Sequence, residues 1–355
     1  MQAIQSTGYS VYFNADCYAF LRDNVTPEKY SKVFVLADSN TSQLCLPNFL
    51  AQFATLVEIE ILEIDAGEIN KTIETCVQAW HALTEMGADR KSLLINVGGG
   101  MVTDLGGFVA STFKRGIDFI NVPTSLLAMV DASVGGKTGV DLGTLKNQVG
   151  VINTPIAVLI DVNYLNTLPQ NQMRSGLAEM LKHGLICNKA YWNQFLDLSG
   201  LTTDDLIELI YTSVIIKNDI VSQDLNEKGL RKILNFGHTL GHAIESYFLE
   251  DPEKEELLHG EAIAIGMVLE SYISFKKDLL TLNEYAEIKE VITSLFGVTH
   301  FSESDILNII NIMSHDKKSE FGEVKFVLLK GIGKAVFNEP VKNDLIINAF
   351  NNYLG

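Results

Sequence analysis

His238 and His242 are the two residues of this sequence whose types and spacing best suit metal or proton chemistry. On a helix, residues four apart lie on one face, one turn from each other. His259 follows about a helix length downstream, and Glu179 supplies a carboxylate upstream. Two histidines and one carboxylate leave a coordination position open, which is the usual composition of a catalytic zinc site. The spacing does not decide whether His242 is a ligand, and the pair alone also fits a half-buried helix that binds nothing.

Positively charged residues accompany these candidate ligands along the chain. Lys182 lies three residues after Glu179, on the same helical face, and Lys217 and Arg231 precede the histidine pair. A single lysine or arginine is usually a solvated surface charge. Together, however, these side chains indicate a basic pocket around a metal. Such a pocket suits a small substrate that carries phosphate or carboxylate groups.

A glycine-rich turn, Gly98-Gly99-Gly100, directly follows an apolar stretch at residues 93–97. Glycines let a backbone approach a pyrophosphate closely, and the start of the following helix favours negative charge. The dinucleotide fingerprint Gly-x-Gly-x-x-Gly is not met, because Thr103 occupies the third glycine position. We therefore predict a phosphate-binding turn that differs from a standard Rossmann NAD site. A tight strand–helix turn without a ligand is the alternative.

A second glycine-rich stretch, residues 130–139, ends in Gly-Lys-Thr. A P-loop needs glycine at the position of Asp131, so this stretch does not predict a nucleotide hydrolase. Lys137 can still place an ammonium group beside an anionic ligand. Lys146 and Asn147 follow within ten residues and add a second cation and an amide.

The bulk composition favours a soluble enzyme with two domains. The chain has 355 residues, 47% of them hydrophobic, which is enough for two sizeable cores. A formal net charge of −17 argues against a nucleic-acid partner, because binding to a phosphate backbone needs a basic surface. The four cysteines form no Cys-x-x-Cys pair, so neither a disulfide framework nor a thiolate zinc site is indicated. Without a signal peptide or an apolar run of about 18 residues, we expect a cytoplasmic protein and no membrane partner.

Residues 1–168 alternate apolar stretches with amphipathic segments, and this alternation predicts an α/β domain with a parallel sheet. We expect strands at residues 33–37, 59–64, 93–97, 119–122 and 157–160. A helix is expected at residues 68–86, and its buried side is predicted to comprise Ile69, Ile73, Cys76, Val77, Trp80 and Leu83.

Helical periodicity dominates after Thr167-Leu168-Pro169, where we place the domain boundary. The second domain, residues 169–355, is expected to be all-α, apart from a small hairpin within residues 324–337 that could return to the first domain. The acidic run at residues 250–256 is interpreted as a solvated loop. Helices are expected at residues 170–187, 190–198, 203–221, 232–249, 258–277, 283–296 and 303–314.

In combination, these segments resemble the 3-dehydroquinate synthase family, part of the sugar phosphate cyclase superfamily. The resemblance extends over essentially the whole chain in order. Two small departures occur, at Ser125, where a second threonine is expected, and at Met129, where glutamine is expected. The matching motifs are Gly98–Gly100 with Asp104 and Gly107-Phe108, Arg115-Gly116, residues 122–127, Asp131–Gly139, Lys146-Asn147, Gly176–Gly184, Leu234–His242, His259-Gly260-Glu261 and Asp316-Lys317-Lys318.

The resemblance implies a Rossmann-like, nucleotide-binding first domain that binds NAD and a second domain that binds substrate and zinc or, in its place, cobalt. It implies the conversion of 3-deoxy-D-arabino-heptulosonate 7-phosphate to 3-dehydroquinate and phosphate, in the shikimate pathway to chorismate and aromatic amino acids. In this reaction NAD oxidises a secondary alcohol, phosphate is eliminated, the ketone is reduced again, and an intramolecular aldol step closes the ring. The implied partners are a small phosphorylated sugar acid and a second copy of the chain, in a homodimer.

The family's functional residues carry over to matching positions of this sequence. The resemblance implies that Glu179, His238 and His259 bind zinc and that His242 transfers protons or forms hydrogen bonds. It assigns further catalytic roles to Lys137, Lys182, Lys217, Arg231 and Asn235. It assigns substrate contacts to Arg115, Asp131, Lys146, Asn147 and one of Lys317 and Lys318. It assigns NAD contacts to Asp38, Glu68, Lys71, Gly99, Gly100, Asp104, Thr124, Ser125, Asp131, Lys137, Lys146 and Thr167.

Other classes of protein share parts of this pattern. Another sugar phosphate cyclase would act on sedoheptulose 7-phosphate or glucose 6-phosphate, which have no carboxylate, whereas Arg231, Asn235 and His242 favour a substrate that has one. A metal-dependent polyol dehydrogenase would release NADH, and the many lysines argue against a neutral polyol. A binding module without catalysis would lack at least one ligand, and none is missing from the sequence.

Overall fold

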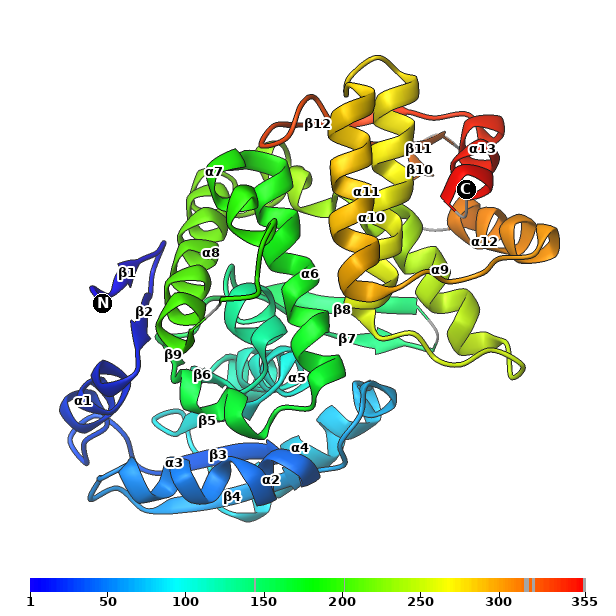
Figure 1. Cartoon of the computed structure of the whole chain (residues 1–355). Coiled ribbons are helices and arrows are strands. Elements are labelled where there is room, and N and C mark those ends of the chain that lie inside the picture. Colours follow the sequence, from blue (N-terminus) through cyan, green and yellow to red (C-terminus); the bar gives the residue numbers. More distant parts are fainter. Residues whose placement is uncertain (144, 201, 316–318, 321–322, 354–355) are drawn as a thin grey trace. The chain divides into compact units, whose positions relative to one another are not determined.

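The computed structural model describes residues 1–143, 145–200, 202–315, 319–320 and 323–353 (Figure 1). The backbone forms two compact units. The first comprises Met1–Met173 with Lys217–Leu225, and the second comprises Arg174–Ile216 with Asn226–Gly355. The long helix α8, Thr203–Gln223, therefore contributes residues to both units.

A seven-stranded sheet forms the centre of the first unit, in the order β1-β2-β9-β6-β5-β3-β4. All neighbouring strands run parallel except β1 and β2. Every residue of β3, β5 and β9 is buried, as is usual for a parallel sheet covered on both faces. The predicted parallel α/β sheet and its five strands are thereby confirmed. The strands are β1 (Ile4–Gln5), β2 (Ser10–Phe13), β3 (Val33–Asp38), β4 (Ile59–Ile64), β5 (Leu93–Gly98), β6 (Asp118–Pro123) and β9 (Ala157–Ile160).

Helix α5, Gly100–Thr112, directly follows β5 and packs on the sheet. Val102, Leu105 and Phe108 of α5 form one buried cluster with Phe34 and Leu94 of the sheet. This packing keeps the first turn of α5 at the carboxyl edge of the sheet. The remaining helices and helical turns of the unit are α1 (Ala15–Asn24), α2 (Ser39–Leu44), α3 (Leu46–Gln52), η1 (Glu68–Asn70), α4 (Ile73–Glu85), η2 (Phe113–Arg115), η3 (Ala128–Ala132) and η4 (Val162–Thr167).

The helix predicted at residues 68–86 begins later in the structure, as α4. The Thr72 side chain accepts a hydrogen bond from the Thr75 amide. This N-cap fixes the start of the helix at Ile73. Ile69 belongs to η1 and is 87% exposed, so its predicted place on the buried side of the helix is wrong. Val77 is exposed as well, whereas Leu83 is fully buried as predicted.

Strands β7, Lys137–Leu142, and β8, Leu145–Ile152, form a separate antiparallel hairpin in the first unit. The sequence did not predict these strands, because glycines interrupt the alternation of apolar and polar residues. The hairpin carries three of the candidate site residues, Lys137, Lys146 and Asn147.

The second unit is mainly helical, as predicted. Helix α10 is buried along most of its length and packs against α9, α11 and α13. Helix α13 was not predicted. The helices are α6 (Gln170–Cys187), α7 (Lys189–Trp192), α8, α9 (His238–Glu250), α10 (His259–Lys276), α11 (Leu282–Phe296), α12 (Glu303–His315) and α13 (Asn343–Tyr353), with the short turns η5 (Asn193–Phe195) and η6 (Leu230–Asn235). Within the described ranges, we find no helix with the length and apolar character to cross a membrane.

A small antiparallel sheet, β10-β11-β12, also belongs to the second unit. Its strands are β10 (Ser319–Glu320), β11 (Glu323–Leu329) and β12 (Ala335–Pro340), so the predicted hairpin is present. The Leu329 amide donates to the Ser274 hydroxyl on α10 at 3.0 Å, and Lys277 pairs with Glu339 at 2.6 Å. The hairpin is thus part of the second unit, and the expectation that it returns to the first domain is wrong.

The helix predicted at residues 232–249 is broken in two. Residues Leu230–Asn235 form η6, and α9 begins only at His238. Gly237, between them, has a φ of 78°, a left-handed value that glycine adopts without the steric cost of a side chain. Arg231 and Asn235 therefore lie outside the helix that carries His238 and His242.

Candidate functional site

Three helices of the second unit converge on one group of side chains. Glu179 comes from α6, His238 is the first residue of α9, and His259 is the first residue of α10. The Glu179 Oε1 atom lies 3.5 Å from His238 Nε2 and 3.8 Å from His259 Nε2. The structure thus brings together the three residues to which the resemblance assigns a metal.

His242 lies in the same group. It follows His238 by one turn of α9, as the spacing predicts, and the two ring centres are 5.2 Å apart. The His242 and His259 ring centres are 5.6 Å apart. One nitrogen from each of His238, His242 and His259 can be chosen so that all three atoms lie within 4.8 Å of one another. By geometry alone, His242 is therefore also placed where it could reach a metal.

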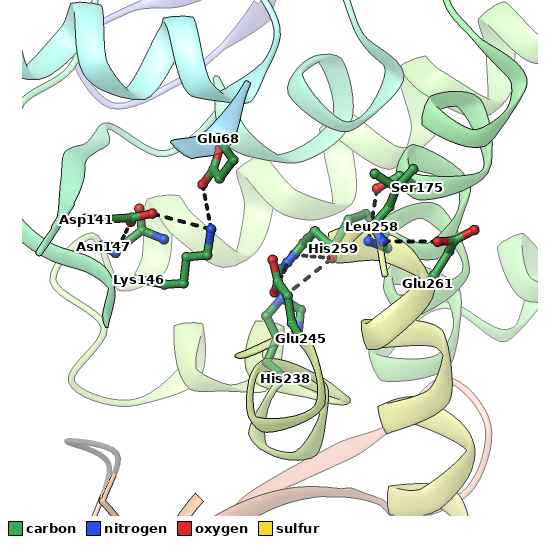
Figure 2. Close-up of polar contacts among 12 residues, drawn as sticks. Glu68, Asp141, Lys146, Asn147, Ser175, His238, Glu245, Leu258, His259 and Glu261 are labelled. Atoms are coloured by element: carbon green, nitrogen blue, oxygen red, sulfur yellow. Dashed lines mark hydrogen bonds and ion pairs between the residues drawn. The ribbon is translucent and has the colours of Figure 1, made fainter. Parts of the chain in front are cut away.

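The outer nitrogens of two histidines face hydrogen-bond acceptors. His238 Nδ1 is 3.1 Å from the Phe236 carbonyl oxygen. His259 Nδ1 is 3.0 Å from Glu245 Oε2 (Figure 2). A carbonyl or carboxylate oxygen can only accept a hydrogen bond. Each Nδ1 therefore carries a proton and donates the hydrogen bond. In the neutral form of each imidazole, the lone pair is then on Nε2, the nitrogen that faces Glu179. This tautomer is the one in which Nε2 can bind a metal.

The Glu179 carboxylate is suited to a cation. Its side chain is fully buried, and its Oε1 atom accepts no hydrogen bond from any residue that the structure describes. Lys182, one turn along α6, forms an ion pair with Oε2, and Oε1 is turned toward the two histidines. A buried carboxylate oxygen without a hydrogen bond is costly. A divalent metal bound by Glu179, His238 and His259 would satisfy it, with the nitrogen and oxygen ligands that zinc prefers.

The other predicted cations of the second unit are also buried. Lys182 and Arg231 are 1% and 2% exposed. Asn235, on η6 with Arg231, donates from Nδ2 to Glu227 Oε1 at 2.5 Å. Polar groups buried to this extent need hydrogen-bond partners. The burial of Lys182 and Arg231 therefore indicates that these two cations have a structural or functional role inside the unit.

Lys217 belongs to the first unit, where its ammonium group contacts Asp131. The Lys217 Nζ atom is 2.7 Å from Asp131 Oδ1 and also donates to the Asp131 backbone carbonyl. The sequence analysis grouped Lys217 with the candidate metal ligands, because it precedes His238 by only 21 residues in the chain. Its contact with Asp131 spans 86 residues and has no local signal in the sequence.

The carboxyl edge of the sheet gathers the candidate dinucleotide residues of the first unit. Gly99 is the N-cap of α5 and Gly100 its first residue, so the amide groups of the first turn face the end of the sheet. The Thr124 amide donates to the Gly98 carbonyl at 2.9 Å, which joins the ends of β5 and β6. A Cβ placed on Gly99 would lie 3.4 Å from Ser125 Oγ. The backbone amides at the start of α5 therefore form a surface that can bind an anion.

Asp38 and Thr167 are two more of the residues predicted to bind the dinucleotide. Asp38 ends β3, the neighbour of β5, and its Oδ1 accepts from the amides of Asn40 and Thr41 at 3.0 and 2.8 Å. Thr167 ends η4, and its hydroxyl donates to the Tyr164 carbonyl at 3.1 Å. In open α/β sheets, ligands bind outside the carboxyl ends of the strands, where Asp38 lies.

A charged network lies between α5, η1 and the β7–β8 hairpin. Lys71 is 3% exposed, and its Nζ lies 2.6 Å from Asp104 Oδ2 and 2.8 Å from Asn147 Oδ1. Burial lowers the pKa of Lys71, but the charges of Asp104 and Glu68 outweigh burial and raise it above its ordinary value. Lys71 therefore stays positively charged at neutral pH.

The hairpin joins this network through Lys146 (Figure 2). Its Nζ lies 3.3 Å from Glu68 Oε1 and 3.4 Å from Asp141 Oδ2. The backbone amide of Asn147 donates a hydrogen bond to Asp141 Oδ1 at 2.6 Å. The unpredicted hairpin thus explains how Glu68 and Lys146, 78 residues apart, meet.

Arg115, Lys137, Lys317 and Lys318 are the remaining predicted site residues. Arg115 is exposed at the far end of α5, and a 13-residue helix is about 20 Å long, so it lies far from Gly100. It lines a surface hollow with Asp89, Arg90 and Lys114. Lys137 is an exposed residue at the start of β7. Lys317 and Lys318 lie outside the described residues.

Sequence reasoning missed Glu245 and Asp141. Glu245 lies three residues after His242, so an acidic residue one turn from a histidine was a signal that could have found it. Asp141 lies in a stretch without a clear pattern, and only the fold of the hairpin shows its contacts with Lys146 and Asn147.

Sequence comparisons place this chain among well-defined relatives. Two family models match it, 3-dehydroquinate synthase N-terminal at residues 61–175 and 3-dehydroquinate synthase C-terminal at residues 176–319. A 3-dehydroquinate synthase from Parabacteroides distasonis is 40% identical over 340 residues, which are 95% of this chain and 96% of the relative. The corresponding protein of Helicobacter pylori strain G27 is 37% identical over 322 residues, or 91% of this chain and 92% of the relative.

Solved structures of sugar phosphate cyclases have a similar fold. A 2-deoxy-scyllo-inosose synthase complexed with carbaglucose-6-phosphate, NAD+ and Co2+ has a TM-score of 0.87 and 26% identity, covering 99% of both chains. The 2-epi-5-epi-valiolone synthase of Streptomyces hygroscopicus, with NAD+ and Zn2+ bound, has a TM-score of 0.84 and 27% identity, covering 100% of this chain and 99% of the other. A probable glycerol dehydrogenase from Sinorhizobium meliloti shares the fold alone, with 13% identity and a TM-score of 0.65 over 100% of this chain and 99% of the other.

Proposed function

The chain belongs to the 3-dehydroquinate synthase family, and from this premise we propose that it converts 3-deoxy-D-arabino-heptulosonate 7-phosphate to 3-dehydroquinate and phosphate. We propose that it does so in the cytoplasm, as a homodimer. The observation that carries the proposal is the convergence of Glu179, His238 and His259 from three helices, beside a buried cationic region.

We propose a first domain, residues 1–168, that binds NAD and a second, residues 169–355, that binds metal and substrate. Glu179, His238 and His259 would hold zinc or cobalt, the metals in the two similar cyclase structures. When bound, such a metal polarises a hydroxyl group and makes its proton easier to remove. The acceptors at Phe236 and Glu245 support this role, because a neutral imidazole that donates from Nδ1 has its lone pair on Nε2.

NAD would bind at the carboxyl edge of the first sheet, where it supplies a hydride acceptor that is restored within each turnover. The amides at the start of α5 would hold the pyrophosphate, and Lys71 would supply a permanent positive charge. The residues proposed for this role are Asp38, Glu68, Lys71, Gly99, Gly100, Asp104, Thr124, Ser125, Asp131, Lys137, Lys146 and Thr167.

The substrate would bind through cations and amides. Arg231 and Asn235 suit the carboxylate, since arginine can donate two parallel hydrogen bonds to it. His242, one turn from His238, would move a proton or form a hydrogen bond to the substrate. Arg115, in the turn that follows α5, is proposed as a further substrate contact. Further substrate contacts are proposed for Lys137, Asp131, Lys146, Asn147, Lys182, Lys217 and one of Lys317 and Lys318.

A single assay tests this function. The zinc-loaded protein is given the heptulosonate phosphate and NAD at catalytic concentration, and phosphate and NADH are followed together. We expect phosphate to accumulate while NADH absorbance stays flat, because oxidation and reduction occur within one turnover. Stoichiometric NADH would indicate a polyol dehydrogenase instead. Phosphate release from sedoheptulose 7-phosphate alone would indicate another sugar phosphate cyclase.

A further inference from the structure

Glu245 is the acceptor for the outer nitrogen of His259, and the contact joins two helices. Glu245 lies on α9 and His259 begins α10, with Oε2 and Nδ1 3.0 Å apart (Figure 2). We infer that Glu245 is a positioning residue that holds the His259 imidazole in the tautomer and orientation required for metal binding. The inference rests on the proposed function, which makes His259 a metal ligand.

The backbone around His259 is already fixed on both sides. The Leu258 amide donates to Glu261 Oε2 at 3.0 Å, and the Gly260 amide donates to Ser175 Oγ at 2.9 Å (Figure 2). The freedom that remains at this position is rotation of the His259 side chain itself. A hydrogen bond to Nδ1 restricts that rotation, because it determines both the plane of the ring and the direction of Nε2.

His259 depends on such a contact more than the other candidate ligands do. Its side chain is 30% exposed, compared with 11% for His238 and none for Glu179. Packing therefore holds Glu179 and His238, whereas His259 has water on part of its surface. The Glu245 side chain is only 13% exposed, so its bond with His259 is largely screened from solvent. A hydrogen bond to a carboxylate is stronger than one to a neutral group.

The two histidines also differ in the acceptor behind them. His238 donates to a neutral carbonyl oxygen at Phe236, and His259 donates to a negative carboxylate. A carboxylate behind an imidazole increases the basicity of the opposite nitrogen and so strengthens its bond to a metal. Glu245 therefore makes His259 the stronger imidazole donor of the pair, in addition to orienting it.

Zinc affinity of the full chain, measured without substrate by competition with a chelator, tests the inference. We expect Glu245→Ala to weaken zinc binding roughly 10- to 100-fold, the usual effect of removing a partner of a metal ligand. Glu245→Gln keeps an acceptor oxygen but loses the charge, so it should recover part of the affinity. Glu250→Ala is the matched control, because Glu250 is an exposed glutamate on the same helix. The zinc affinity of this variant should equal that of the unmodified protein.

A double-mutant cycle with His259→Ala separates positioning from a structural role. If Glu245 acts through His259, then Glu245→Ala should cause no further loss of zinc affinity once His259 is alanine. An equal loss in both backgrounds would overturn the inference, as would a lower Tm of metal-free Glu245→Ala that Glu245→Gln does not recover. Unchanged zinc binding in His259→Ala would overturn the metal assignment and this inference together. Weaker binding in His259→Ala but not in Glu245→Ala would overturn this inference alone.

Discussion

The Gly260 amide donates to the Ser175 hydroxyl at 2.9 Å, and a Cβ on Gly260 would lie 2.2 Å from the Ser175 carbonyl oxygen. Ser175 lies one helical turn before Glu179 on α6, and Gly260 directly follows His259 on α10. The contact of these two backbones therefore sets the separation between a carboxylate and an imidazole of the candidate metal site.

Gly260→Ala should damage this contact. Alanine is intrinsically better than glycine in a helix by about 1 kcal/mol. Here, however, the added Cβ meets backbone atoms, which cannot rotate away, and overpacking of this kind costs about 1–3 kcal/mol or more. We expect the clash to prevail, with a lower Tm and weaker zinc binding. Gly200→Ala is the control, since a Cβ there meets nothing within 4 Å. Unchanged zinc affinity in Gly260→Ala would contradict the argument.

Glu179 and Lys182 form a buried ion pair, and removing one partner should be costly. Glu179→Gln leaves the Lys182 ammonium buried without its counter-charge, which costs about 3–5 kcal/mol. We expect urea unfolding of the metal-free protein to show this loss. The double variant Glu179→Gln/Lys182→Met should regain most of the stability, because neither charge then remains. Both variants should lose zinc binding, and equal stability of the single and double variants would argue against the pairing.

Arg231 is predicted to set the preference for a carboxylated substrate. It is 2% exposed, so its guanidinium would bind a carboxylate largely away from water, and a substrate without a carboxylate would lose these hydrogen bonds. Sites built to hydrogen-bond a missing group discriminate by roughly 10⁴-fold, and we expect kcat/KM to favour the heptulosonate over sedoheptulose 7-phosphate to this extent. Arg231→Lys should lose much of the preference and keep zinc binding, because lysine cannot form two parallel hydrogen bonds. Lys232→Arg, at the next position of η6, serves as the control. Comparable kcat/KM values for the two sugars in the unmodified protein would refute the assignment.

Asp305 should make stability depend on acid pH. It accepts hydrogen bonds from the Tyr247 hydroxyl at 2.7 Å and from the Lys254 ammonium and Ser302 amide, both at 2.8 Å. Burial opposes the charge of Asp305, but these donors outweigh burial and lower its pKa from 3.8 to about 2. The run at residues 250–256, interpreted from the sequence as a solvated loop, is thus attached to the protein at Lys254.

A carboxyl group whose pKa is lower in the folded state stabilises the protein above its unfolded pKa, near 3.8, and loses this effect as pH falls toward 2. The shift corresponds to about 2 kcal/mol. Asp305→Asn should therefore cost about 2 kcal/mol at pH 7, and the difference from the unmodified protein should narrow between about pH 4 and pH 2. Urea unfolding at pH 7, 4 and 3 measures it. A difference that does not change with pH would show that the charge of Asp305 is not the cause.

Features that depend on neighbours along the chain could be predicted from the sequence. The apolar runs of β3 and β5, the glycine turn before α5, and the one-turn spacing of His238 and His242 all follow from the repeat of a strand or a helix. The break at Gly237 escaped this reasoning, because helical periodicity continues on both sides of a single glycine with positive φ.

The partners of several charged site residues were decided only by the tertiary structure. Glu245 and His259 are 14 residues apart, Lys71 and Asn147 are 76 apart, and Lys217 and Asp131 are 86 apart. No local pattern relates such residues, since their meeting depends on how whole helices and a hairpin pack. A buried charge needs a partner, and folding can supply that partner from any part of the sequence.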